Sequence, residues 1–310
     1  MPPLTYHHGQ ISIQEEAKTR YVADHLAHWV GPVIDFALDA DLVLLAAPDA
    51  GGVLRFSVLS GAPPLVEVAD ADATRLRFPE EFSRGLEEAP YGGLVINLGL
   101  ARRARLNGRI AKAGEAAVLT AAETFTLCRK YMAPSMALER EPRVGPGSRE
   151  PIGLDDAWLA SLLARTETSF LASVSPDGGP DVAHRGGPPG FITVDAARGT
   201  VSWPEFVGDG VFKSAGNVRA TGSFTLLALD LETGDGVELA GTGAYTNLRP
   251  ERKARLDPLV RHKEPFPVQG VIEGRVSDAW RLTGVLHPRR RIDEALKVTS
   301  ASTVDEQAPR

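Results

Sequence analysis

The sequence predicts a mainly β protein with flanking helices (α+β), built from two β-barrel units in tandem. Its 310 residues are about twice the commonest domain size, so two units of similar length are expected. Short segments rich in Val, Leu, Ile, Phe and Thr alternate with turns such as Pro-Asp-Gly, Gly-Pro-Pro and Thr-Gly-Asp-Gly. Such turns are typical of antiparallel hairpins, and segments of this kind recur in the same order in both halves.

Composition narrows the class of protein. Hydrophobic residues make up 43% and charged residues 24% of the chain, which is ordinary for a protein that folds in water. The formal net charge of -6 argues against a nucleic-acid partner, because proteins that track phosphates usually carry a basic excess. Cys128 is the single cysteine, which makes a reducing cytoplasm the expected location. Neither a signal peptide nor an apolar stretch long enough to span a membrane is present, so no membrane partner is expected.

Residues 1–140 form the predicted N-terminal unit, which we expect to be the more diverged copy. Ser12 to Glu15 has the pattern of a capping box, and an apolar stripe over residues 22–29 is expected to continue that helix. Gly31-Pro32 should end it. Strand segments begin at Leu42, and residues 116–132 have a helix-like pattern.

Residues 141–150 are predicted to be an exposed linker. The surrounding segment REPRVGPGSREP is dense in proline, glycine and charge and has no hydrophobic period. Residues 151–310 then form the C-terminal unit. A helix is expected over residues 154–166, because Asp155 and Asp156 suit a helix start and its dipole.

The two halves align segment by segment. LVLLAA followed by PDAGG corresponds to FLASV followed by SPDGG, and TRLRFPEEF corresponds to TVSWPEF. GLVINLGLARRARLNGRI and FTLLALDLETGDGVELAGTGAY each contain an apolar strand, a polar turn and another strand. This order of segments indicates an internal repeat. In this alignment Leu59 and Ser60 stand where the second half has His184 and Arg185.

Four consecutive stretches of the second half, DVAHRGGPPGFITV, TVSWPEF, GDGVFKSAGNV and LLALDLETGDGVELAGTG, resemble FMN-binding split-barrel proteins related to pyridoxamine phosphate oxidase. In the first half HHGQISIQEEA, RRARLNGRI and FTLCRKYM resemble the amino-terminal unit of tandem members of that family. The resemblance implies two tandem split β-barrel units that form an intramolecular pseudo-dimer. It also implies that FMN lies between the units, with a small molecule as substrate and a homodimer as a possible further assembly.

The same resemblance implies a cofactor site in the C-terminal unit. The implied cofactor-binding residues are Arg185, Trp203, Pro204, Lys213, Ser214 and Asn217, and His184 is the candidate catalytic residue near the flavin or substrate. The chemistry agrees, because a flavin phosphate needs cationic groups, hydroxyls and backbone amides that converge on it. His184 is chosen because a histidine can exchange protons near neutral pH. Each residue also has a structural alternative, such as a solvated Arg or a core Trp.

The first copy lacks this pattern, so we expect its own phosphate site to be lost. Its basic strand residues either face the intact site across the pseudo-dimer or form an exposed strand face; these residues are Arg102, Arg103, Arg105, Asn107 and Arg109. His7 and His8 have no metal-ligand spacing around them, and Cys128 is interpreted as structural. Phosphate-binding loops of the Rossmann and Walker types and a hydrolase nucleophile elbow are absent from the sequence.

The function expected from the sequence is an FMN-dependent oxidoreductase acting on an unidentified small molecule, with the flavin carrying the redox step. Vitamin B6 oxidation is one possibility among many. Two alternatives stay open. The same fold could bind deazaflavin or haem, or the chain could bind flavin without catalysing a reaction.

Overall fold

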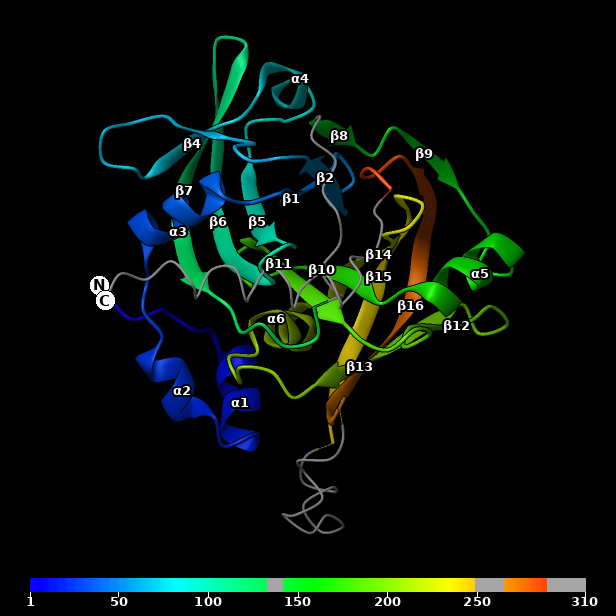
Figure 1. Cartoon of the computed structure of the whole chain (residues 1–310). Helices are drawn as coiled ribbons and strands as arrows, with labels where there is room; N and C mark the ends of the chain where they lie inside the picture. The colour runs from blue at the N-terminus through cyan, green and yellow to red at the C-terminus, as the bar shows by residue number, and fades with distance from the viewer. Residues whose placement is uncertain (133–141, 249–264, 289–310) are drawn as a thin grey trace, which may run out of the picture.

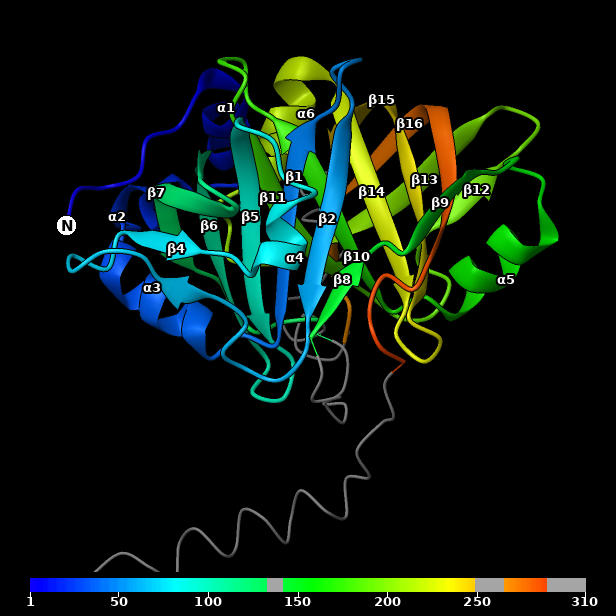
Figure 2. The same cartoon turned by 90° about the horizontal axis from the view of Figure 1, so that it is seen from above.

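The computed structural model describes residues 1–132, 142–248 and 265–288, and it contains two curled antiparallel sheets with helices packed around them (Figure 1). Viewed from above, the sheets lie side by side, with β2 and β11 among the strands near their junction (Figure 2). The predicted fold class, two tandem split-barrel units with flanking helices, is confirmed.

The N-terminal unit carries the first sheet. Its strand order is β3-β4-β7-β6-β5-β1-β2-β8, and all the pairs are antiparallel. Its helices are α1 (His8–Glu16), α2 (Arg20–His25), α3 (Val30–Leu38) and α4 (Glu80–Ser83). Its strands are β1 (Leu42–Pro48), β2 (Leu54–Ser60), β3 (Glu67–Val68), β4 (Arg75–Arg77), β5 (Pro90–Asn97), β6 (Arg102–Ala113), β7 (Ala116–Thr126) and β8 (Arg143–Gly145).

The C-terminal unit carries the second sheet. Its order is β11-β10-β14-β15-β16-β13-β12, and β9 (Ser148–Pro151) pairs with β16. Its helices are α5 (Ala157–Arg165) and α6 (Lys213–Thr221). Its other strands are β10 (Thr168–Val174), β11 (Pro180–Gly186), β12 (Thr193–Asp195), β13 (Thr200–Phe206), β14 (Ser223–Asp230), β15 (Asp235–Asn247) and β16 (Val268–Thr283).

The two sheets have the same strand order once β8 and β9 are set aside. Starting from the second strand of the first hairpin in each unit, the order β2-β1-β5-β6-β7-β4-β3 corresponds to β11-β10-β14-β15-β16-β13-β12. Both long hairpins also have a register shift at the corresponding place, between Asn107 and Gly108 in one unit and between Ala240 and Gly241 in the other. Shared bulges fix the register, so residues of the two units can be matched one for one.

Register corrects the alignment made from the sequence. Leu42 pairs with Ser60 in β1 and β2, and Thr168 pairs with Gly186 in β10 and β11, at the same end of each hairpin. The residues that correspond to His184 and Arg185 are therefore Val58 and Leu59, one position earlier than the predicted Leu59 and Ser60. The sequence alignment failed by one residue because it was anchored on prolines in loops of unequal length.

Three apolar cores hold the molecule together. One fills the N-terminal barrel, a second fills the C-terminal barrel, and a third lies between the two sheets. The third core includes Leu44 and Phe56 from the first unit and Phe170 and Leu227 from the second. Burial of large apolar side chains is the main stabilising force in such interfaces, so the units form one body.

Helix α1 belongs to the C-terminal core by contact, although it comes first in the chain. Ile13 is fully buried in that core, and a side chain on Gly9 would meet the carbonyl oxygen of Gly216 in α6 at 2.5 Å. Gln10 and Gln14 donate hydrogen bonds to the carbonyl oxygens of Lys213 and Val211 at 3.3 and 2.7 Å. The N-terminal helix therefore fixes the start of α6 and the loop before it.

Three local predictions are wrong. Residues 116–126 form β7 and not a helix, because pairing with β6 and β4 overrides the helix propensity of their alanines. Helix α1 begins at His8 with a capping box between His7 and Gln10, which places Ser12 inside the helix. Gly31-Pro32 lies in the first turn of α3, where proline is tolerated, and does not end a helix. In contrast, α5 is capped by Asp156 as predicted.

The predicted linker contains two short strands. Strand β8 pairs with β2 of the first sheet and β9 pairs with β16 of the second. The unit boundaries at residues 140 and 151 stay a prediction.

Candidate functional site

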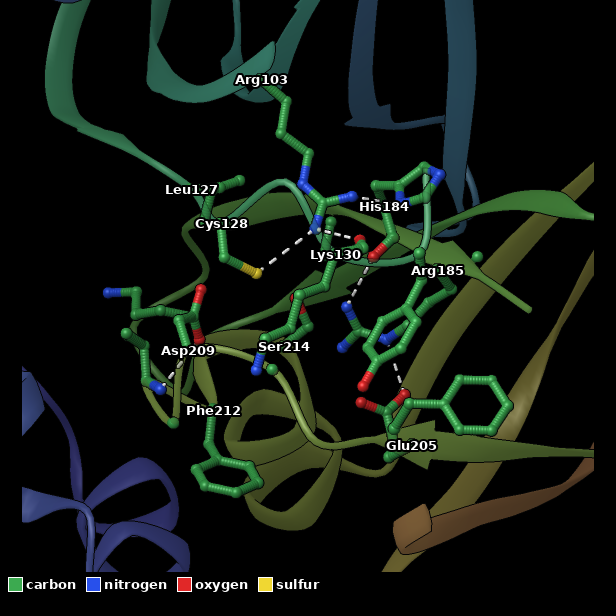
Figure 3. Close-up of a pocket in the computed structure, with 18 of the residues that line it drawn as sticks. Arg103, Leu127, Cys128, Lys130, His184, Arg185, Glu205, Asp209, Phe212 and Ser214 are labelled. Atoms are coloured by element: carbon green, nitrogen blue, oxygen red, sulfur yellow. Dashed lines mark hydrogen bonds and ion pairs between the residues drawn. The ribbon is translucent and has the colours of Figure 1, made fainter. Parts of the chain in front are cut away.

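A cationic cavity lies where the two units meet, between β6 and β7 of one unit and β11, β13 and α6 of the other (Figure 3). Its volume is about 90 Å³. Five cationic side chains line it, against the carboxylates of Glu205 and Asp209; the cations are Arg103, Arg105, Lys130, Arg185 and Lys213. Excess positive charge at a partly closed junction favours an anionic ligand.

Arg103 is the most informative of these cations. It extends from β6 into the cavity and is only 8% exposed. Its guanidinium donates to Nδ1 of His184, to Sγ of Cys128 at 3.6 Å and to the carbonyl oxygen of Lys130 at 3.1 Å. Among the described residues it forms no ion pair with a carboxylate. Burial lowers the pKa of Arg103, and Arg185 acts in the same direction. Cys128 and Asp209 act in the opposite direction, but no carboxylate of the described residues contacts the Arg103 guanidinium, so its charge is only partly compensated.

A buried ion pair lies beside Arg103 and joins the units. Arg105 of β6 contacts Asp181 of β11, with side chains that are 6% and 3% exposed. Asp181 also accepts a hydrogen bond from Ser214 Oγ at 2.7 Å and one from Asn107 Nδ2 at 3.1 Å. Burial alone would raise the pKa of Asp181, but Arg105, Lys213 and Ser214 together hold it below its usual range. Asp181 is therefore ionised and its charge is already compensated.

The other two basic residues predicted from the sequence also have carboxylate partners. Nε of Arg185 lies 2.6 Å from Oε1 of Glu205, which also accepts from Nε1 of Trp203 at 3.1 Å. Nζ of Lys213 lies 2.6 Å from Oε2 of Glu123, a residue of β7 in the other unit. Arg185 keeps further guanidinium N–H groups, and the Lys213 ammonium keeps two further N–H groups, for a ligand.

The start of α6 adds backbone donors to the cavity. Phe212, Lys213 and Ser214 line it, and Phe212 has a left-handed conformation with φ 57° and makes no side-chain cap. The first amides of a helix have no partner within the helix, and they carry the positive end of its dipole. On the opposite wall, Gln269 is 5% exposed and its Oε1 has no hydrogen-bond partner among the described residues.

His184 is neutral in this environment. Burial is the main cause of a pKa well below the usual histidine value, and the adjacent Arg103 and Arg185 lower it further. Because Arg103 donates to Nδ1, the ring proton must sit on Nε2. The expectation that His184 exchanges protons near neutral pH conflicts with this pKa. In the structure, His184 accepts a hydrogen bond from the Arg103 guanidinium and so orients it.

Residues 127–132, the segment that follows β7, line one side of the cavity and are called the covering segment below. Cys128, Lys130 and Tyr131 line the cavity, and the hydroxyl of Tyr131 donates to the carbonyl oxygen of Val207 at 2.8 Å. Tyr131 has φ 61°, an unfavourable conformation for an aromatic residue. A side chain on Gly186 would meet the Tyr131 carbonyl oxygen at 1.7 Å, so only glycine allows this crossing.

A second cavity of about 600 Å³ adjoins the first across Lys213, which lines both. Tyr6, Tyr91 and Asn217 are among its lining residues. Asn217 accepts hydrogen bonds from His7 and Gln10 at 2.8 and 2.9 Å and donates to Ser173 at 3.1 Å. Asn217 therefore ties α1 to α6 next to the cationic cavity but does not line that cavity.

The structure gathers most of the predicted site residues. His184, Arg185, Pro204, Lys213 and Ser214 line the cationic cavity. Trp203 does not, because it is fully buried in the C-terminal core against Phe224. Pro204 and Trp203 are neighbours on a strand, so their side chains point to opposite faces. The position of Trp203 therefore does not support its predicted role as a cofactor-binding residue.

The basic strand of the first unit divides between the two cavities. Arg103 and Arg105 line the cationic cavity, Asn107 and Arg109 line the second cavity, and Arg102 lies over the ring of Phe36. The sequence did not indicate Glu205, Tyr131 or Gln269. Glu205 lies in the quoted segment TVSWPEF and Tyr131 in FTLCRKYM, but neither was assigned a role, and Gln269 lies outside every quoted segment.

Two kinds of site are not found in the part of the chain that the structure describes. No group of three or more His, Cys, Asp or Glu side chains is placed to hold a metal ion there. Over the same residues, no helix has the length and apolar character needed to cross a membrane.

Comparison with known proteins gives matches to solved structures only. No family model matches the sequence, and no curated protein matches it. HupZ from Group A Streptococcus is 16% identical with a TM-score of 0.30, and the match covers 41% of this chain and 92% of that chain. A putative pyridoxamine 5'-phosphate oxidase from Lactobacillus delbrueckii is 21% identical with a TM-score of 0.29, over 40% of this chain and 91% of that one.

An F420 reductase is 18% identical with a TM-score of 0.28, over 40% of this chain and 97% of that one. The structural neighbours are thus pyridoxamine 5'-phosphate oxidase-like, general stress protein 26 and F420 reductase split-barrel proteins, each matching about 40% of the chain.

Proposed function

We propose that this protein is an FMN-binding oxidoreductase of the pyridoxamine phosphate oxidase-like class, acting on a small molecule. The observation that carries the proposal is Arg103, a buried guanidinium without a carboxylate partner among the described residues, directed into a cavity at the junction of the units. A phosphate group is nearly dianionic at neutral pH and supplies the compensating charge.

The lining residues fit the phosphate end of FMN. Arg103 and Arg185 offer planar guanidinium groups, which suit phosphate oxygens, and Lys213 supplies a flexible point charge. The start of α6 lies at the same cavity, where its first amides could donate to an anion as in other anion sites at helix starts. The unpaired Oε1 of Gln269 can accept a hydrogen bond from a hydroxyl of the ribityl chain.

Bound FMN would supply the redox chemistry, and the protein would bind it, orient it and set its electrostatic environment. His184 holds Arg103 in position by accepting its hydrogen bond. A phosphate beside the two guanidiniums would offset their effect and raise the pKa of His184 towards its ordinary value. Proton exchange at His184 would then depend on the bound ligand.

Ligand entry requires movement of the covering segment. The cationic cavity of about 90 Å³ holds a phosphate-sized group, whereas flavin-sized ligands occupy pockets of roughly 300–1,000 Å³. Leu127, Cys128, Lys130 and Tyr131 line the cavity, and the side chains of this segment make two hydrogen bonds to the loop after β13, both to the carbonyl oxygen of Val207. We therefore expect this segment to shift when FMN binds.

The proposal is tested by the double variant Arg185→Ala with Lys213→Ala. FMN affinity is measured by quenching of flavin fluorescence, with Arg198→Ala as a control because Arg198 is exposed and far from the cavity lining. The double variant should lose FMN retention, and the control should bind as the unchanged protein does. Unchanged FMN affinity in the double variant would contradict the site assignment.

Deazaflavin and haem in this fold, and flavin binding without turnover, are the alternatives. The phosphate arm of a deazaflavin cofactor would meet the same cations, so affinity for phosphate does not separate it from FMN. The visible absorbance spectrum of the purified protein does, and the mass of the released ligand identifies it. Turnover with added reductants and oxidants separates an oxidoreductase from a protein that only binds flavin.

A further inference from the structure

Two similar units that face each other generate two equivalent junctions, as in a symmetric dimer. The structure shows this equivalence at an ion pair. Arg105 of the first unit contacts Asp181 of the second, and the corresponding residues in the matched registers are Glu238 and Arg55. Glu238 of the second unit indeed contacts Arg55 of the first at 2.9 Å. The basic and the acidic residue have exchanged strand positions, but the ion pair occupies the corresponding position at both junctions.

The rings beside these pairs confirm the match. Phe125 pairs with Arg105 in the strand ladder, and Trp280 pairs with Glu238 at the corresponding position. Arg105 lies over Phe125 at 5.6 Å, and Arg55 lies over Trp280 at 5.5 Å. The cationic cavity at the first junction therefore has a definable counterpart at the second, next to β2 and the segment that follows β16.

At the first junction no strand of the described residues pairs with the outer edge of β11. Strand β11 is the last strand of its sheet, the covering segment (residues 127–132) crosses it closely at Gly186, and both line the cavity. At the second junction that space is filled. Strand β8 pairs with Val58, Leu59 and Ser60 of β2, which correspond to His184, Arg185 and Gly186.

The other side of β8 is equally closed. A side chain on Gly145 would meet the Val285 carbonyl oxygen at 2.1 Å, and Gly147 donates to the carbonyl oxygen of Thr283 at 2.9 Å. Just beyond β8, Arg149 contacts the fully buried Glu238 and donates to the carbonyl oxygen of Phe56 at 3.2 Å. Strand β8 thus lies between β2 and residues 283–286, where the other junction has its cavity.

We infer that the chain holds one anionic ligand per polypeptide, at the β11 junction, because its own linker strand β8 permanently occupies the equivalent place at the β2 junction. The identity of the ligand rests on the proposed function. The occupation of the β2 junction by β8 does not, because it follows from backbone pairing alone.

The test uses the full-length protein and two measurements. Amide hydrogen exchange over residues 142–147, measured without ligand, should be as slow as in the paired strand β1. Titration with FMN should then saturate at one FMN per chain, and Arg103→Met should weaken that binding roughly 30-fold to 1,000-fold while the protein stays folded. Fast exchange in β8, a second bound FMN, or unchanged FMN affinity in Arg103→Met would each overturn the inference. If the unchanged protein binds no FMN, the proposed function fails, and the exchange rate of β8 alone decides whether the β2 junction is occupied.

Discussion

The two junctions between the units have the same frame and opposite chemistry. At the β11 junction, five cations line a cavity. Among the described residues, no strand pairs with the outer edge of β11 and no carboxylate pairs with the buried guanidinium of Arg103. At the β2 junction, Val58 and Leu59 replace His184 and Arg185, and β8 completes the sheet. The two junctions therefore show that one strand arrangement can serve two purposes. With a few polar side chains and no strand added to the sheet edge, it forms a candidate ligand site. With β8 added to the sheet edge, it forms a structural contact.

The two interface ion pairs are expected to differ most in their effect on stability. Asp181→Asn leaves Arg105 buried without its countercharge, which should lower the free energy of unfolding by about 3–5 kcal/mol. Glu238→Gln should cost about 1–2 kcal/mol, because Arg55 and Arg149 are 20% and 24% exposed and can reach water. Chemical denaturation of both variants measures the difference. Equal losses would show that the junctions are energetically alike.

Ligand affinity should depend on only one junction. Arg103→Met removes the cation that lacks a carboxylate and should weaken FMN binding by about 2–4 kcal/mol, which is roughly 30-fold to 1,000-fold. Arg149→Met removes a cation from the other junction and is the matched control. Isothermal titration compares the two. A loss of FMN affinity in Arg149→Met, with Arg103→Met unaffected, would place the ligand at the β2 junction.

His184 should make the free energy of unfolding depend on pH. Val58, the corresponding residue at the β2 junction, has no titratable group and should have no such effect. The pKa of His184 in the folded protein lies well below the ordinary value of about 6.5 expected for the unfolded chain, so the unfolded chain binds more protons. Stability from this group is complete above about pH 6.5 and is lost as the pH falls below it, with a slope of up to about 1.4 kcal/mol per pH unit. His184→Gln should flatten the profile over pH 5–6.5, approximately; an unchanged profile would contradict the assigned environment.

An ion pair outside both junctions should matter least. Arg198 and Asp195 are 79% and 45% exposed, so Arg198→Ala should change the free energy of unfolding by less than about 0.5 kcal/mol. Thermal unfolding of Arg198→Ala and Asp181→Asn, measured side by side, compares the two losses of stability. A larger loss in Arg198→Ala than in Glu238→Gln would undermine the use of burial to rank these pairs.

The sequence predicted the strand units, because hairpin turns and the repeated order of segments are local signals. His184, Arg185, Lys213 and Ser214, which line the cavity, were named from the family resemblance, and their roles stay a prediction. The decisive Arg103 could only be offered as one of two interpretations, because its partners are 25 residues or more away in the sequence. Register shifts decided which residue of a hairpin faces the junction, and no sequence pattern showed that Val58 corresponds to His184.

Position in the core was equally hard to foresee. Trp203 and Pro204 are adjacent in the sequence, and only the pleat of β13 sends one to the core and the other to the cavity. Likewise, the alanines of β7 favour a helix by propensity, and it is pairing with β6 that makes them a strand. Long-range pairing therefore limited what could be predicted.

The most direct test of the account is the visible spectrum of the freshly purified protein, together with the mass and amount of any small molecule released on denaturation. The account predicts flavin absorbance and the mass of FMN, at no more than one FMN per chain. A colourless protein that also fails to bind added FMN would leave the two split-barrel units in place and contradict the flavin-binding assignment of the β11 junction.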